Sequence, residues 1–207
     1  THPDLANSLV EQVDFVFGED DSYRSAPHGT HVAGIIGADD PDIGVAPDVG
    51  LISLQVGTPT PGLDPTVSAR HIEAALNWVL EHRVEHNIVA VTMPFGEGFY
   101  STVDGAGTPV YLDEIQALQA LNVATVSAAG DDYGVHQATW TNPAFDPLLS
   151  DSAAPGVFST FNAGAVWAED VGGGFLINST MEGSTAADRV AAFSQRPPRF
   201  AGNGLFA

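Results

Sequence analysis

The chain has 207 residues, of which 44% are hydrophobic, and this is enough for one globular domain with a packed core. Six basic residues against 26 acidic ones give a net charge of -20, which argues against nucleic acid or an anionic membrane as a partner. The absence of cysteine excludes disulfides, thiolate catalysis and cysteine-ligated zinc. No run of 18 apolar residues is present, so no membrane span is expected.

The first half of the chain alternates between predicted strands and helices. Residues 13–17 alternate like a short strand, and residues 28–37 pass from a polar start into small and branched apolar residues, as in a buried helix. Residues 51–56 are typical of a strand covered on both faces, whereas residues 57–64, rich in Gly, Pro and Thr, predict a loop. A helix is expected from Pro65 to about His86, and its apolar stripe consists of Ile72, Leu76, Val79, Leu80 and Val84.

The second half continues the alternation. Residues 87–93 and 123–129 read as buried strands, with a helix at 112–121 between them, and residues 157–166 and 175–177 read as later strands. Strands that alternate with helices predict an α/β domain with a mostly parallel sheet and helices on both faces. No linker or repeat divides the chain, so residues 1–207 are expected to form a single domain.

Three segments are expected to meet at the carboxyl edge of this sheet, where ligands bind in such folds. They are the loop that leads to His28, the run Pro94-Phe95-Gly96 after one strand, and Gly130-Asp131 after another. An imidazole can exchange protons near neutral pH, so His28 is the candidate catalytic residue. His31 lies on roughly the same side of the helix, but no third ligand at a useful spacing is evident, and no metal site is predicted.

The run HGTHVAG at residues 28–34 resembles the catalytic-histidine motif of the subtilisin-like serine proteases, the subtilases (peptidase family S8). The runs HPDL at 2–5, GVAP at 44–47 and SAAGD at 127–131 resemble further landmarks of the family in the family's order. The resemblance implies a three-layer subtilisin-like α/β fold, with a mostly parallel central sheet flanked by helices. It also implies a serine endopeptidase that acts on a polypeptide substrate, with His28 as general base and then general acid.

The resemblance further implies a substrate cleft with two departures from the family pattern. Asp131 stands at the position of the oxyanion-hole Asn, where an ionised carboxylate would repel the oxyanion and a protonated one could donate to it. Pro94 lacks an N–H, so one hydrogen bond to the substrate backbone is expected to be missing. The residues expected to line the cleft are Pro94, Phe95, Gly96, Ala128, Ala129 and Gly130.

The other two triad members are expected outside the sequence. In the family, the Asp precedes the HPDL turn, and the Ser follows a Phe-Ser landmark that Phe193-Ser194 resembles. His28 is therefore expected to be the only triad member in residues 1–207, which are predicted to be inactive on their own. Ser184 precedes the landmark and is followed by Thr185, the reverse of the family's order, so it is not expected to be the nucleophile; Asp4 belongs to the turn and is not expected to be the triad Asp.

Several alternatives stay open. The altered positions 92–96 and Asp131 are compatible with a catalytically inactive subtilase-like domain that acts in binding, and His28 with His31 is compatible with a metal-assisted hydrolase. No cofactor is required, although Asp39, Asp40 and Asp42 resemble a shortened calcium loop. A secreted, extracellular location is expected, because the acidic surface suits a strongly hydrated exported protein.

Overall fold

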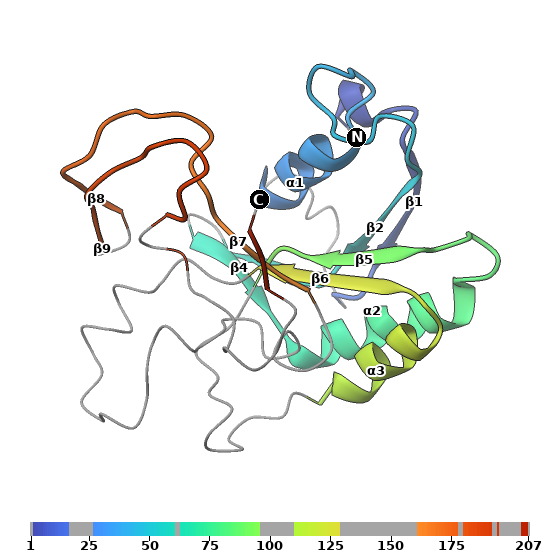
Figure 1. The fold of residues 1–207 in the computed structure, drawn as a ribbon. Coiled ribbons are helices and arrows are strands. Elements are labelled where there is room, and N and C mark those ends of the chain that lie inside the picture. Colours follow the sequence, from blue (N-terminus) through green and yellow to red (C-terminus); the bar gives the residue numbers. More distant parts are fainter. Residues whose placement is uncertain are drawn as a thin grey trace. The chain divides into compact units, whose positions relative to one another are not determined.

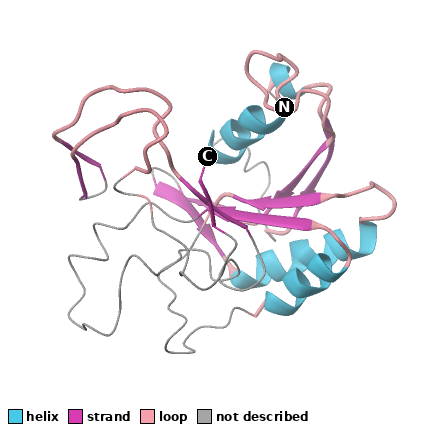
Figure 2. Ribbon diagram, in the orientation of Figure 1, coloured by secondary structure: helices cyan, strands magenta, loops and turns pink. Residues whose placement is uncertain are grey.

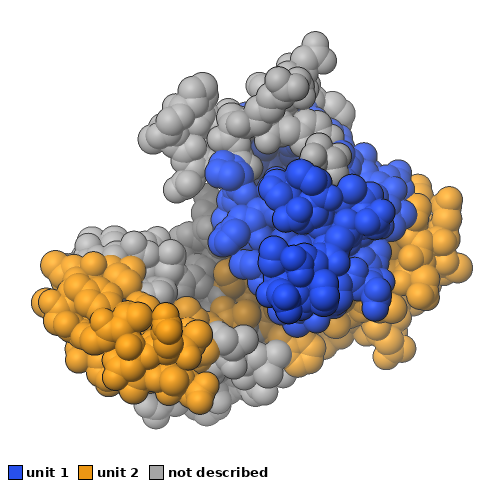
Figure 3. Space-filling model, turned by 90° about the horizontal axis from the view of Figure 1, so that it is seen from above, with its two compact units in different colours: residues 1–79 blue, residues 80–207 orange. Residues whose placement is uncertain are grey.

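The computed structural model describes residues 2–16, 27–60, 63–95, 110–128, 161–177, 180–191, 194 and 204–206. The chain divides into two compact units, Thr1–Val79 and Leu80–Ala207, which Figure 3 distinguishes by colour. The boundary passes through a helix, and the expectation of a single domain stays a prediction. Within the described part of the chain, no helix combines the length and the hydropathy that crossing a membrane requires.

The first unit begins with a parallel strand pair. The short 3-10 helix η1 (Pro3–Leu5) precedes β1 (Leu9–Asp14), which pairs with β2 (Leu51–Gln55) (Figure 1). The predicted strand at 13–17 is misplaced, because pairing already starts at Leu9 opposite Leu51. The polar pair Glu11 and Gln12 lies inside the strand and hid its beginning from the sequence pattern.

Helix α1 (Pro27–Gly37) lies where the sequence predicted a helix, but its burial differs from the prediction. Residues 27–31 are exposed, Ile35 is 49% exposed, and Gly37 is the one buried residue of this helix. Residues 32–37 of the helix are apolar or glycine on all sides, which favours burial, yet a local pattern carries no information about which other segment would cover them.

Residues 57–64 were predicted as a loop, but β3 (Gly57–Thr60) and β4 (Leu63–Val67) form an antiparallel strand pair (Figure 2). Pro65 therefore lies in a strand and does not begin a helix. The pairing of the two strands is irregular between Thr58 and Thr60. Each strand of a two-stranded sheet also has an outer edge without a neighbouring strand, and a proline on that edge needs no N–H for pairing. These features explain how a segment rich in proline still pairs.

Helix α2 (Ala69–His82) buries most of the predicted stripe: Ile72, Leu76 and Val79 are at most 6% exposed, and Leu80 is half-buried. The helix ends at His82 and is followed by a turn in which Asn87 has a φ of 52°. Val84 is consequently 75% exposed, so its assignment to the buried stripe is wrong. The apolar residues of the sequence keep a helical spacing as far as Val84, although the helix itself ends at His82.

The second unit contains a parallel sheet with the strand order β10-β7-β6-β5. Its strands are β5 (Ala90–Met93), β6 (Ala124–Ala128), β7 (Phe161–Gly164) and β10 (Gly204–Phe206). The first three lie within predicted strands, whereas β10 was not predicted. Helix α3 (Leu112–Ala120) contacts β6 and buries Ile115 and Leu118 completely, as its apolar spacing indicated.

A second hairpin joins β8 (Phe175–Ile177), which was predicted, to β9 (Thr180–Glu182), which was not. Trp167 packs edge-on against Phe175, and its indole N–H donates to the Glu182 carboxylate over 3.1 Å. A three-residue strand that contains a buried glutamate gives no recognisable strand pattern in the sequence.

Gly44 packs closely against the backbone of Ala38, so a larger residue at position 44 should destabilise the first unit. A Cβ at Gly44 would lie 2.7 Å from the Ala38 backbone nitrogen and closer still to its carbonyl oxygen. We expect Gly44→Ala to lower the free energy of unfolding by about 1–3 kcal/mol, measured by urea denaturation, because the loop must move. Gly34→Ala is the control, since a Cβ there meets nothing within 4 Å; an equal loss in both variants would contradict the steric explanation.

Candidate active site

His28 lies in the first turn of α1, directly after Pro27, which begins the helix. Proline suits this position because its fixed φ is helical and its missing N–H has no partner to lose there. The His28 side chain is exposed. The local sequence thus presents an imidazole at the start of a short helix, where it is accessible for proton exchange with a bound molecule.

His31 is the second imidazole of α1 that could bind a metal ion together with His28. His31 is also exposed and lies on the next turn of α1. Among the residues that the structure describes, no three His, Cys, Asp or Glu side chains gather closely enough to hold a metal ion. The described residues therefore supply no third ligand for a site at His28 and His31.

The carboxyl edge of β5 and β6 brings together part of the predicted cleft. The last residues paired between these strands are Met93 and Ser127. Pro94 then ends β5, because it has no N–H to offer, while β6 continues to Ala128, which pairs with Ala163 of β7. Pro94 and Phe95, both half-buried, thus follow β5 at the edge where β6 ends.

Not every predicted site residue can be placed. Gly96, Ala129, Gly130 and Asp131 lie outside the described residues. His28 belongs to the first unit and the β5–β6 edge to the second, so the convergence of the two stays a prediction.

Ser184 takes part in a local turn. Its hydroxyl oxygen accepts a hydrogen bond from the Ala186 N–H over 3.4 Å. The next residue, Thr185, is fully buried. Its hydroxyl lies within hydrogen-bond distance of the Asp170 carboxylate and the Gly172 carbonyl as a donor, and it accepts from the Val171 N–H. These contacts give the Gly183-Ser184-Thr185 run a structural role, and the expectation that Ser184 is not the nucleophile stays a prediction.

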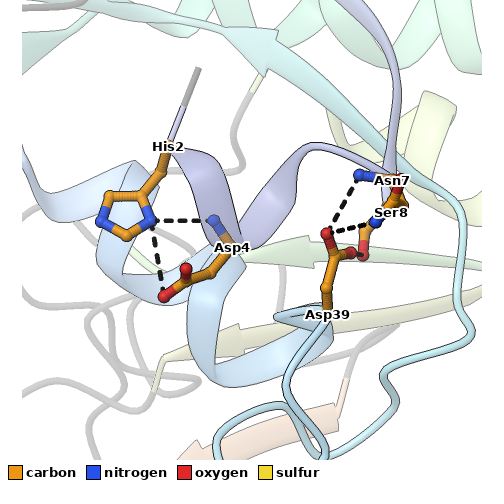
Figure 4. A network of polar contacts seen from close by, with 5 residues as sticks. All are labelled: His2, Asp4, Asn7, Ser8 and Asp39. Atoms are coloured by element: carbon orange, nitrogen blue, oxygen red, sulfur yellow. Dashed lines mark hydrogen bonds and ion pairs between the residues drawn. The ribbon is translucent and has the colours of Figure 1, made fainter.

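A set of side-chain hydrogen bonds that was not predicted centres on Asp39, shortly after α1 (Figure 4). Its Oδ2 accepts from the Asn7 backbone N–H at 3.1 Å and from the Asn7 side-chain amide at 2.8 Å. Its Oδ1 accepts from the Ser8 hydroxyl at 2.7 Å. The Asp39 N–H in turn donates to the Asp4 carbonyl over 2.7 Å. No periodic pattern could have indicated these contacts, because they join residues 31 to 35 positions apart.

These donors stabilise the ionised form of the Asp39 carboxyl. The hydroxyl of Ser8 contributes most and the two Asn7 groups add to it, so the pKa lies below its usual value of 3.8, although partial burial opposes this. The other titratable residues on the segments that Asp39 joins are His2 directly before η1, Asp4 within it, and Asp40 and Asp42 on the loop of Asp39.

His2 and Asp4 form a separate contact at the beginning of η1 (Figure 4). The Asp4 N–H lies 3.3 Å from His2 Nδ1, and an Asp4 carboxylate oxygen lies 3.7 Å from the same nitrogen. Nδ1 accepts the first contact only when it carries no proton, and donates to the second only when it does. Both side chains are about half exposed, so this contact contributes little to stability. Asp4 thus serves the turn, as the sequence indicated.

Asp39 does not suit a calcium ion as it is arranged. Calcium requires six or more oxygen ligands, whereas both Asp39 oxygens face N–H and O–H donors. The Asp40 carboxylate accepts from the Asp42 N–H over 2.9 Å within its own loop. The structure therefore gives no support to a calcium ion bound by Asp39.

The model of the subtilase family (Peptidase_S8) matches residues 1–204 of the chain. Among solved structures, the S41 psychrophilic protease is 23% identical with a TM-score of 0.61, over 94% of this chain and 54% of its own. Sphericase is 21% identical with a TM-score of 0.59, over 94% and 55%. The prenylagaramide maturation protease PagA is 18% identical with a TM-score of 0.59, over 100% and 57%.

These likenesses establish a subtilisin-like α/β fold, in agreement with the mostly parallel strands described above. The chain spans little more than half the length of each of these three structures. No curated protein sequence matches it.

The lowered pKa of Asp39 predicts a pH-dependent contribution to stability. It is present above the carboxyl pKa of the unfolded chain and is lost as the pH falls through the lower pKa of the folded state. We therefore expect Asp39→Asn to lower the melting temperature at neutral pH, with a difference from wild type that shrinks at about pH 3. Asp42→Asn removes the same charge from the same loop and controls for net charge; an equal effect in both variants would contradict the role of the hydrogen bonds.

Proposed function

Because the chain belongs to the subtilase family, we propose that the protein containing it is a serine endopeptidase in which His28 is the general base and then the general acid. The observation that carries the proposal is the HGTHVAG run, which places an exposed imidazole in the first turn of α1 within a chain matched by the family model. The other two triad roles are not assigned to residues of this chain.

In the proposed reaction, His28 accepts the proton of a serine hydroxyl as the hydroxyl oxygen attacks the peptide carbonyl. A tetrahedral intermediate forms and collapses as the protonated His28 gives its proton to the leaving amine. Water then hydrolyses the acyl-enzyme with His28 again as base. No cofactor takes part in these steps.

The substrate in this proposal is an extended polypeptide that lies along the β5–β6 edge. The geometry at this edge supports the idea, because β5 ends at Met93, directly before Pro94, and the neighbouring strand β6 ends at Ala128. A peptide can form main-chain hydrogen bonds at such an edge, with one fewer at Pro94. The proposed lining residues outside the described part are Gly96, Ala129 and Gly130.

A second candidate function is a subtilase-like domain that binds polypeptides without cleaving them. Two sequence observations favour it, namely Asp131 at the oxyanion position and Pro94 at the cleft edge. An ionised Asp131 would destabilise the oxyanion and leave binding largely intact. Peptide binding without labelling by a fluorophosphonate would identify this function in the full-length protein.

We expect His28→Ala in the full-length protein to lower kcat for a chromogenic peptide by at least about 10⁴-fold, because the nucleophile loses its base. The same variant should lose labelling by a fluorophosphonate probe. His31→Gln is the matched control on the same helix and should stay close to wild type in both assays. Equal losses in the two variants, together with loss of activity on chelation, would favour metal-assisted hydrolysis instead.

A separate prediction concerns the oxyanion position. Asp131→Asn supplies an amide donor in place of a carboxylate and should raise kcat at neutral pH by about 10- to 100-fold, with KM little changed. Steady-state kinetics of the full-length protein on one peptide substrate measure both constants. An unchanged or lower kcat would remove Asp131 from the oxyanion site.

A further inference from the structure

The end of α1 opposite His28 is tied to the beginning of the chain by a compact set of hydrogen bonds (Figure 4). The Asp39 carboxylate accepts three of them, from two Asn7 groups and from Ser8, and the Asp39 N–H donates a fourth to the Asp4 carbonyl. Ser8 is only 3% exposed, so its hydroxyl is largely shielded from competing water. Four hydrogen-bonding groups of residues 4–8 therefore bind a single residue, Asp39, which follows α1.

The same end of α1 is fixed from a second direction. The N–H groups of Val45 and Ala46 donate to the carbonyls of Ile35 and Ile36, which are among the last of the helix and lack partners within it. Residues 38 and 44 also pack closely, because a Cβ at Gly44 would collide with the backbone of Ala38. Asp39 thus connects a firmly held helix end to residues 4–8.

Residues 4–8 are in turn anchored to the sheet. The Ser8 carbonyl accepts from the Leu51 N–H over 2.7 Å, directly before the first pair between β1 and β2. The segment bound by Asp39 therefore has little freedom to follow a displaced helix. Any loss of the Asp39 contacts should appear as movement of α1 relative to the strand pair.

Helix α1 transmits such movement to its other end. His28 and Gly37 are nine residues apart, which is roughly 14 Å along a helix axis. A tilt of about 5° at the Gly37 end would move the His28 end by about 1 Å. A misplacement of about 1 Å can cost a reaction about 100-fold in rate.

We propose that Asp39 is a positioning residue for His28, which sets the orientation of α1 through its hydrogen bonds to residues 4–8 and needs no bound cation to do so. The proposal rests on the proposed function for its catalytic consequence. Its structural part, the orientation of α1, is independent of catalysis.

The test compares Asp39→Ala, Asp39→Asn and the control Asp42→Asn in the full-length protein. Asp39→Ala removes all three side-chain acceptor contacts, whereas asparagine keeps one acceptor oxygen. If Asp39→Ala does not fold, Ser8→Ala is used in its place, because it removes only the hydrogen bond between the Ser8 hydroxyl and the Asp39 carboxylate. Each variant is assayed for kcat and KM on a peptide and for the position of the His28 imidazole signals in a ¹H–¹³C NMR spectrum.

We expect kcat to fall by about 10- to 100-fold in Asp39→Ala and by less in Asp39→Asn, with KM within about twofold of wild type. The His28 signals should move in the same order, and Asp42→Asn should match wild type in both measurements. Wild-type kcat and His28 signals in a folded Asp39→Ala protein would overturn the proposal and leave Asp39 with a purely stabilising role.

The two levels of the proposal can fail separately. If wild type shows neither peptidase activity nor fluorophosphonate labelling, the proposed function is wrong, and the NMR comparison alone decides whether Asp39 orients His28.

A calcium titration of the melting temperature completes the test. The increment caused by calcium should be the same in wild type and Asp39→Ala. Its loss in the variant would make Asp39 a calcium ligand and overturn the mechanism proposed here.

Discussion

The hydrogen bonds of Asp39 are the constraint on which the first unit depends. They connect Asn7 and Ser8, which lie between η1 and β1, to the end of α1 and, through Ser8, to the beginning of the β1–β2 pair. The chemistry suits so acidic a chain: with six basic residues for 26 acidic ones, few carboxylates can find a cation. Asp39 is stabilised instead by neutral N–H and O–H donors, which lower its pKa as a positive charge would.

The candidate catalytic parts are carried by two kinds of element that suit their tasks. His28 stands in the first turn of a short helix whose last turn is held by hydrogen bonds, so its position follows the orientation of that helix. Pro94 and Phe95 follow β5, and Ala128 is the last residue of the neighbouring parallel strand β6, so the paired register places all three at the carboxyl end of the sheet. A general base needs accurate placement, whereas a substrate backbone needs main-chain N–H and C=O groups that are not already paired within the sheet.

Much of the secondary structure could be predicted, and the failures share a cause. Helix α3 and the stripe of α2 were identified because one face of each is buried against its neighbours. Val84 continued the same spacing but lies beyond the end of α2. The hairpins of β3 with β4 and of β8 with β9 were missed in whole or in part, because pairing between short strands depends on the partner more than on local composition.

The family, the helical position of His28 and the succession of parallel strands could be inferred from the sequence, because each is encoded in a local motif or in a period of apolar residues. The contacts of Asp39 with Asn7 and Ser8, and the exposure of the first turns of α1, became evident from the folded chain alone. These features depend on residues that are far apart along the chain. A carboxylate selects its donors in space, from residues more than thirty positions away, and neither composition nor periodicity records that choice.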